Sequence, residues 1–339
     1  MNRRTLLQNL ALATAALNPA LTHSAPKTRD PLGEILPTRP LANTGESITC
    51  LGLGGFHIGE PQNEKEAQKI IEAALEGGIR FFDNAHAYHK GLSEKRFGKF
   101  LTPRYRDHIF LMTKSGKANA KAARQELEES LRRMNTDVID LWQLHSLSNE
   151  NDTANRLTNG VIDMALKARQ EGKIRHIGFT GHASPYALTR MLEDPTAREA
   201  CVTCMLPINP VDASSTHSHI AHAIPPMLKN NISPLAMKTL ADGRFFNKKK
   251  RKGRTIWESN DPIVPQHLSL KDCIEFALAL PIATLITGAN CIEHIQDKIQ
   301  IAQRFNGLNQ TQRIAIINKV SDFALSGNIE YYKNQNLRG

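Results

Sequence analysis

The chain has 339 residues, a formal net charge of +10 and five cysteines. Its 40% hydrophobic and 22% charged residues exclude a wholly disordered chain, a collagen-like repeat and a disulfide-dense scaffold. The length suits one barrel-type domain or two smaller domains, and the positive charge raises nucleic acid and membrane surfaces as candidate partners.

The first 25 residues differ in composition from the rest. They contain no acidic residue, carry Arg3 and Arg4, and continue as an Ala/Leu-rich run over 10–17. That run is too short to cross a bilayer, which needs about 20 apolar residues. A charged start before a short apolar run is typical of a signal peptide, and the paired arginines resemble a twin-arginine export signal. An ordinary Sec signal or a frayed tail is the alternative.

We therefore predict three parts of the chain: a signal peptide over 1–25, a leader over 26–36 and one barrel domain over 37–335. The export machinery would carry the protein to a bacterial periplasm, with no stable membrane span. Removing residues 1–25 subtracts two arginines and no acid, which leaves a charge of +8.

Short apolar runs alternate with longer amphipathic segments along the rest of the chain. Strict alternation predicts a parallel sheet, and eight units favour an α/β fold closed as a (β/α)₈ TIM barrel. Residues 39–45 precede the first run and predict an N-terminal β-hairpin. The strand candidates are 48–53, 79–83, 109–114, 138–145, 174–180, 202–209, 232–237 and 284–288, and the helix candidates are 64–76, 117–134, 159–171, 185–192, 217–229, 270–280 and 292–305.

Titratable residues end three consecutive strand candidates. Asp83, Lys114 and His145 close the second, third and fourth runs, and Tyr88 follows Asp83 by five residues. Each alone has a plain structural explanation, as a helix cap, a lysine reaching solvent or a satisfied core histidine. Because the carboxyl ends of barrel strands meet at one rim, the four together predict an active site.

These residues resemble the Asp, Tyr, Lys and His tetrad of the aldo-keto reductase superfamily. The resemblance is carried by the run Asp-Asn-Ala-His-Ala-Tyr over 83–88, by Lys114 and by Leu144-His145, with flanking motifs at 51–55, 172–178 and 236–240. It covers about residues 39–305. It implies a (β/α)₈ barrel that binds a nicotinamide cofactor and transfers hydride to and from a small carbonyl or sugar-like substrate.

The resemblance assigns a role to each member of the tetrad. Tyr88 would be the general acid/base that protonates the developing alkoxide. The cation of Lys114 would lower the pKa of Tyr88, Asp83 would hold Lys114 charged, and His145 would position the carbonyl.

The resemblance also implies the cofactor contacts. NADP(H) is expected in preference to NAD(H), although residues 288–289, His294 and Lys298 depart from the family's pattern for the adenosine 2′-phosphate. Thr180-Gly181 stands where many relatives have Ser-Asn, so carboxamide recognition is rearranged. The implied cofactor residues are Gly54, Gly55, Asp83, Thr180, Asn209, Met237, Lys238, Leu240, Gly243 and Gly288.

Other features carry less information. The basic run over 247–254 has no interleaved aromatic residues, so we expect no nucleic-acid binding and interpret it as a solvated loop. Cys201 and Cys204 lack the second ligand pair of a zinc site, and no carboxylate or Cys completes the histidines near His219, so we expect no metal. The odd number of cysteines favours unpaired thiols.

Two other functions remain open at this stage. The same barrel could serve as a non-turnover nucleotide-binding sensor or partner subunit, which the altered carboxamide residues would suit. Lys114 could also form a Schiff base, because desolvated lysines at strand ends do that chemistry. A multiple-turnover assay and borohydride trapping would discriminate these alternatives from a reductase.

Overall fold

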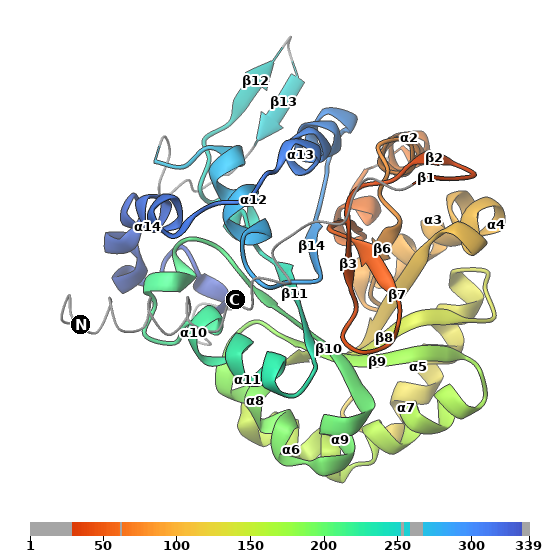
Figure 1. Ribbon diagram of the computed structural model, residues 1–339. Helices are drawn as coiled ribbons and strands as arrows, with labels where there is room; N and C mark the ends of the chain where they lie inside the picture. The colour runs from red at the N-terminus through yellow and green to blue at the C-terminus, as the bar shows by residue number, and fades with distance from the viewer. Residues whose placement is uncertain (1–28, 62, 252–253, 258–266, 334–339) are drawn as a thin grey trace.

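Eight parallel strands form a closed barrel in the computed structural model, which describes residues 29–61, 63–251, 254–257 and 267–333 (Figure 1). Each strand pairs with the next along the chain, and β14 returns to β5 to close the ring. The barrel strands are β5 (Leu51–Gly54), β6 (Phe81–Asp83), β7 (Phe110–Ser115), β8 (Ile139–Leu147), β9 (Ile174–Gly181), β10 (Cys201–Pro207), β11 (Ser233–Met237) and β14 (Thr284–Thr287). This confirms the predicted (β/α)₈ barrel. Each of the eight strand candidates overlaps one barrel strand, and the first candidate, 48–53, also includes the end of β4 (Ser47–Thr49), which lies outside the barrel.

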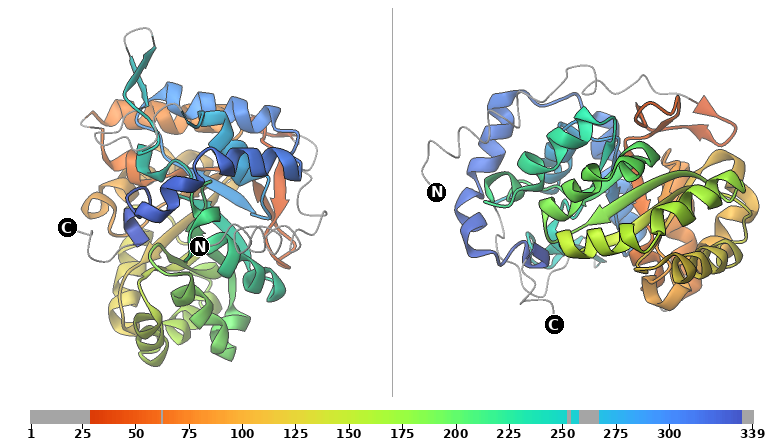
Figure 2. Two further views of the ribbon diagram at one scale, coloured as in Figure 1. Left: turned by 90° about the vertical axis from the view of Figure 1, so that its left-hand side faces the viewer. Right: turned by 90° about the horizontal axis from the view of Figure 1, so that it is seen from below.

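Helices surround the strands, and α13 runs beside α2 to complete the outer ring (Figure 2). The helices are α2 (Glu64–Glu76), α3 (Leu92–Phe100), α4 (Thr102–Tyr105), α5 (Ala120–Arg133), α6 (Glu150–Thr158), α7 (Val161–Gln170), α8 (Pro185–Thr189), α9 (Pro195–Ala200), α10 (His219–His222), α11 (Ile224–Lys229), α12 (Leu270–Leu278), α13 (Ile292–Arg304) and α14 (Gln310–Asn318). None of the helices in the described ranges has the length and apolar character needed to cross a membrane.

The first helix shows how local sequence sets an element's ends. Asn63 accepts a hydrogen bond from the backbone of Lys65 and caps the start of α2. Gly78 lies in the turn between α2 and β6 with a φ of +91°, and a Cβ there would lie 2.8 Å from the backbone nitrogen of Leu36. A side chain at that position would therefore strain the turn that leads to β6.

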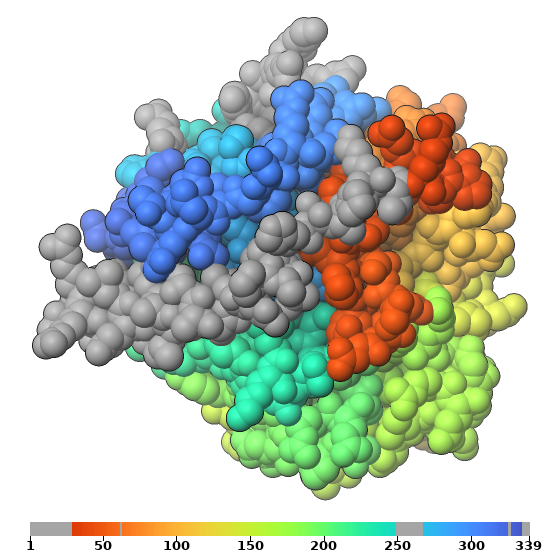
Figure 3. All heavy atoms as spheres, viewed as in Figure 1, coloured from red at the N-terminus to blue at the C-terminus, as the bar shows by residue number. Residues whose placement is uncertain are grey.

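The predicted N-terminal hairpin covers one end of the barrel. Its strands are β3 (Thr38–Pro40) and β4 (Ser47–Thr49), paired antiparallel. Leu41 and Ile48 pack with Phe81 and Leu141 inside the barrel, and the backbone of Ala42 donates to Ser233 Oγ at the start of β11. The hairpin therefore closes the amino-terminal end of the barrel. In the space-filling view, the orange-red N-terminal segment that contains the hairpin lies above the green residues from the middle of the chain (Figure 3).

The structure differs from the sequence predictions at two places in the chain. The basic run is not a plain loop, because β12 (Lys249–Arg251) pairs with β13 (Arg254–Trp257). None of the helix candidates includes α6, which begins after Asn149 caps the backbone of Asp152. The predicted signal peptide over 1–25 lies outside the described residues.

Candidate active site

The four predicted catalytic side chains meet at the carboxyl end of the barrel. Asp83 is the last residue of β6, Lys114 lies in β7 and His145 in β8, while Tyr88 begins the 3₁₀ turn Tyr88–Gly91 after β6. Lys114 Nζ pairs with Asp83 Oδ1 and lies 3.3 Å from Tyr88 Oη. The rings of Tyr88 and His145 meet edge to face with centroids 5.8 Å apart. One proton donor, one cation and one imidazole therefore face the same space.

The lysine is buried, yet all its protons are used. It is 1% exposed, and it donates to Asp83, to Tyr88 and, at 2.7 Å, to the carbonyl of Asn84. A buried charge without such partners would be strongly destabilising. Pairing fixes Nζ at a position set by the β6 and β7 backbones, so Tyr88 Oη has a fixed cation beside it.

Backbone contacts hold the loop that carries the tyrosine. The backbone amides of Asn84 and His86 donate to the carbonyls of Met112 and Lys114, both on β7. Gly55 packs on the start of this loop, where a Cβ would lie 2.4 Å from the Asp83 carbonyl oxygen. That close approach requires glycine at position 55.

Electrostatic contacts from α5 hold the same loop on its outer side. His86 Nε2 lies 2.8 Å from Glu129 Oε2, and His86 Nδ1 lies 3.1 Å from Glu126 Oε1. Arg133 donates to the His86 carbonyl. His86 belongs to the 83–88 motif that carries Asp83 and Tyr88, but its ring is turned away from the site and toward α5.

Burial changes the pKa of the tyrosine in the direction opposite to the sequence prediction. Desolvation raises the pKa of Tyr88 above its usual value, and this outweighs the lowering by Lys114. Burial likewise raises the pKa of Asp83 against the attraction of Lys114. For Lys114, burial acts to lower the pKa, but Asp83 and Tyr88 together raise it. The lysine is therefore cationic and the tyrosine protonated at neutral pH.

The histidine of the tetrad is neutral. Burial lowers the pKa of His145 well below its ordinary value, and repulsion by Lys114 and His182 lowers it further. A neutral imidazole has one N–H donor and one acceptor nitrogen, so His145 can donate a hydrogen bond to a carbonyl oxygen without carrying charge.

The predicted cofactor glycines lie at the ends of β5 and β14. A Cβ on Gly54 would lie 3.3 Å from the Thr287 carbonyl oxygen, and a Cβ on Gly288 would lie 1.8 Å from His57 Nδ1. Lys298 is 4% exposed and donates to the Gly288 carbonyl, and within the described ranges no carboxylate lies at ion-pair distance from it. Burial lowers the pKa of Lys298 to about 8. A buried cation beside neutral His57 is suited to an anionic group.

The other predicted cofactor residues lie at or just after the carboxyl ends of β9, β10 and β11. Thr180 Oγ1 accepts a hydrogen bond from the Ser146 backbone. Met237 ends β11, and Lys238 pairs with Asp242 at 2.7 Å in the loop that also contains Leu240 and Gly243. Gly243 has a φ of +80°. These residues share the rim with the tetrad.

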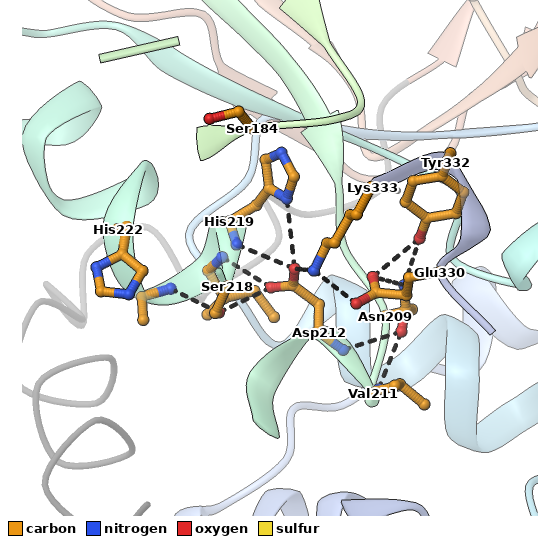
Figure 4. A network of polar contacts seen from close by, with 12 residues as sticks. Ser184, Asn209, Val211, Asp212, Ser218, His219, His222, Glu330, Tyr332 and Lys333 are labelled. Carbon is orange, nitrogen blue, oxygen red and sulfur yellow. Dashed lines mark hydrogen bonds and ion pairs between the residues drawn. The ribbon is translucent and has the colours of Figure 1, made fainter. Parts of the chain in front are cut away.

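Asn209 is committed to other protein atoms. Its Oδ1 accepts from the backbones of Val211 and Asp212, and its Nδ2 donates to Glu330 Oε1 and Tyr332 Oη (Figure 4). These four bonds use the donors and acceptor lone pairs of the amide. The side-chain amide of Asn209, one of the predicted cofactor residues, is therefore fully hydrogen-bonded within the protein in this arrangement.

Sequence reasoning missed the C-terminal residues beside Asn209. Glu330, Tyr332 and Lys333 follow the last predicted helix and belong to no recognised motif. The one local signal is the spacing of three between Glu330 and Lys333, which places their opposite charges close together, at 2.5 Å.

Comparison with known proteins identifies relatives of the same architecture. The model of the aldo/keto reductase family matches residues 50–321. The chain is 32% identical to an L-galactose dehydrogenase of Arabidopsis thaliana over 154 residues, which is 42% of this chain and 48% of that protein. It is 28% identical to a D-threo-aldose 1-dehydrogenase of a Pseudomonas species over 48% of this chain and 64% of that protein. These matches thus span about half to two thirds of the relatives' lengths.

Solved structures share the fold. An aldo-keto reductase AKR11C1 from Bacillus halodurans superimposes with a TM-score of 0.65 at 23% identity, over 84% of this chain and 96% of that one. A glycerol dehydrogenase AKR11B4 from Gluconobacter oxydans gives a TM-score of 0.64 at 19% identity, over 84% of this chain and 95% of that one. At this level of identity the likeness is one of fold.

Proposed function

The chain belongs to the aldo/keto reductase family of oxidoreductases, and on that premise we propose that it transfers hydride between NADP(H) and a small, sugar-like carbonyl or alcohol. The observation that carries the proposal is the contact of Tyr88 with a buried, ion-paired lysine on one side and a neutral histidine on the other. A phenol with a fixed cation beside it is suited to giving a proton to a developing oxyanion.

The chain's own residues divide the proton chemistry. Hydride, the chemistry that the nicotinamide supplies when bound, converts a carbonyl into an alkoxide that needs a proton. Tyr88 Oη gives that proton, and the charge on Lys114 Nζ stabilises the phenolate that remains. Asp83 keeps Lys114 charged. His145 donates a hydrogen bond that orients the carbonyl oxygen.

Features of the β14 end support NADP(H) as the cofactor. Lys298 is a buried cation whose charge would be stabilised by a phosphate group. The backbone around Leu240 and Gly243 is suited to a close approach of the pyrophosphate. These residues would hold the adenosine half while the tetrad faces the nicotinamide.

A sugar-like substrate is supported by the wall of the site. Phe56 is 45% exposed and meets the ring of Tyr88 edge to face at 5.4 Å. An exposed aromatic ring beside a proton donor suits a polyol that offers an apolar face and hydroxyl groups. The names of two relatives, an L-galactose dehydrogenase and a D-threo-aldose 1-dehydrogenase, point to the same class.

The decisive experiment is a turnover assay of the purified protein. We expect consumption of NADPH with aldoses or ketoses and formation of NADPH in the reverse direction with the corresponding alcohols. Parallel assays with NADH measure the cofactor preference. Binding of nucleotide without multiple turnovers on any carbonyl of the panel would favour a nucleotide sensor.

We also propose export to the periplasm by the twin-arginine route, which the Arg3-Arg4 pair before a short apolar run supports. That route carries folded proteins, so the enzyme would leave the cytoplasm with its nucleotide bound. Replacement of both arginines by lysine is expected to retain the protein in the cytoplasm, as measured by cell fractionation. Equal periplasmic amounts of both forms would contradict this route.

A further inference from the structure

The segment after α14 runs across the carboxyl end of the barrel and contacts two loops there. We call residues 328–333 the C-terminal strap. One of its contact loops follows β10 and contains Asn209 and Asp212; the other follows β11 and contains Lys238 and Asp242. Both loops lie at the rim that holds the tetrad.

The first attachment is a buried ionic cluster. Lys333 Nζ pairs with Asp212 Oδ1 and lies 2.5 Å from Glu330 Oε2 (Figure 4). Asp212 is fully buried and Glu330 is 4% exposed. Lys333 is therefore the cation that separates two buried carboxylates. The attachment of the strap to the loop after β10 depends on it.

Asp212 also organises its own loop. Its carboxylate accepts from the hydroxyl of Ser218 and from the backbones of His219 and Ile220 at the start of α10. The attachment of Lys333 is thus made to a carboxylate that the loop already holds rigidly. Lys333 and Glu330 belong to the strap, so they are the members of the cluster that would move with it.

The second attachment reaches the loop after β11. Tyr331 Oη donates to Asp242 Oδ2 at 2.7 Å, and Arg244 donates to the carbonyl of Asn328 at 2.6 Å. Asp242 is also the partner of Lys238, whose Nζ lies 5.7 Å from the ring centroid of Tyr332. The strap is therefore fixed at both sides of the rim.

Tyr332 lies between the two attachments and faces the site. It is 3% exposed, and its hydroxyl bonds Asn209 and Glu330. Its ring meets His182 at 6.4 Å, His182 meets His145 at 6.5 Å, and His145 meets Tyr88. A continuous row of rings thus joins the strap to the catalytic tyrosine.

We propose that the C-terminal strap is a gate for nucleotide exchange: it must detach from the loops after β10 and β11 before a dinucleotide can enter or leave, and Lys333 is its lock. This inference rests on the proposed function, because it takes the rim as the nucleotide site. Detachment would separate buried opposite charges, so exchange would be slow. Slow exchange suits an enzyme that keeps its nucleotide after export.

Release of bound nucleotide tests the gate. The wild-type protein is loaded with NADPH, mixed with excess NADP⁺, and the loss of bound-NADPH fluorescence gives the release rate. We expect Lys333→Met to raise this rate by about tenfold or more, since it leaves two buried carboxylates without their cation. Lys333→Arg is expected to restore slow release in part. Lys319→Met is the matched control, because Lys319 pairs with Asp272 on an exposed surface.

A milder variant keeps the test valid if Lys333→Met fails to fold. Tyr331→Phe removes only the hydroxyl bond to Asp242, and we expect it to speed release by a smaller factor. Hydrogen exchange over 328–333 reports whether each variant loosens the strap. A loosened strap with an unchanged release rate would overturn the gate alone. Failure of the wild type to bind either nucleotide would instead overturn the proposed function, and the gate with it.

Discussion

Lys114 Nζ contacts both the carboxylate of Asp83 and, at 3.3 Å, the hydroxyl of Tyr88. The two contacts act in opposite senses on the tyrosine. Burial is the largest effect and raises the pKa of Tyr88; the Lys114 cation acts to lower this pKa, and Asp83 acts to raise it. Lys114 therefore places a fixed positive charge beside Tyr88, the proposed proton donor, while Tyr88 stays protonated.

Replacement of the proposed proton donor is the first test of this arrangement. Tyr88→Phe keeps the ring against Phe56 and His145 but removes the hydroxyl. We expect carbonyl reduction to slow by about 10²–10⁴-fold, the usual contribution of a positioned acid, with little change in NADPH affinity. Single-turnover kinetics and fluorescence titration measure the two quantities. Retention of more than a few per cent of the rate would exclude Tyr88 as the donor.

Loss of the counter-ion is expected to act through the lysine. Asp83→Asn leaves Lys114 in a site where burial lowers its pKa and the main opposing attraction is gone. We expect a loss of about 3–5 kcal/mol in unfolding free energy, typical of a broken buried pair, and a rate that falls as pH rises and Lys114 deprotonates. Urea unfolding and the pH profile of kcat measure these effects. Asp163→Asn, at an exposed position of α7, is the control. An unchanged pH profile of kcat in Asp83→Asn would contradict the role assigned to Asp83.

The sequence predicts the tetrad because each of its members is marked by the residues directly around it. Asp83, Lys114 and His145 each end an apolar run, and barrel topology brings such ends together. The strap could not be found in this way, because Lys333 and Asp212 are 121 positions apart. The direction of the Tyr88 pKa also depends on burial by distant segments. Polar α6 was missed because its capping residue, Asn149, stands within a run of polar residues that resembles a loop.

The two directions of the reaction should depend differently on pH. The raised pKa of Tyr88 keeps it protonated through neutral pH, so reduction should be flat there and fall only near or above pH 10, the usual tyrosine value. Alcohol oxidation needs the phenolate and should rise with pH. The low pKa of His145 adds no change between pH 6 and 8. Profiles of kcat in both directions test this, and a fall of reduction between pH 7 and 8 would refute it.

The His86 contacts predict a stability optimum in mildly acidic solution. Burial acts to lower the pKa of His86, but Glu126 and Glu129 together raise it above its usual value. The contribution of protonated His86 to the free energy of unfolding is therefore complete below about pH 6.5, and it is lost as the pH rises through the pKa of His86 in the folded protein. Burial acts to raise the pKa of Glu126, but His86 and Ser115 lower it to about 2. The contribution of ionised Glu126 to the free energy of unfolding is therefore complete above about pH 4.5, and it is lost as the pH falls toward 2.

His86→Gln tests this pair. The difference in unfolding free energy between the wild type and the variant should be largest between about pH 4.5 and 6.5, and should shrink on both sides of that window. Urea unfolding from pH 3 to 9 measures it. His108→Gln on the 3₁₀ turn Arg106–His108 is the control. A difference that is constant with pH would show that His86 contributes by packing alone.

The buried charge of Lys298 leads to a prediction about the preference between NADPH and NADH. The side chain is buried beside Gly288 and His57, and burial holds its pKa near 8, so a nearby dianion would favour its charged form. Lys298→Met keeps the volume and removes the charge. If the adenosine 2′-phosphate binds there, KM for NADPH should rise by about tenfold or more, the scale of a lost charge-assisted hydrogen bond, whereas KM for NADH should change little. Lys271→Met, at an exposed position of α12, is the control. Equal rises for both cofactors would instead place Lys298 near a group that NADPH and NADH share, such as the pyrophosphate.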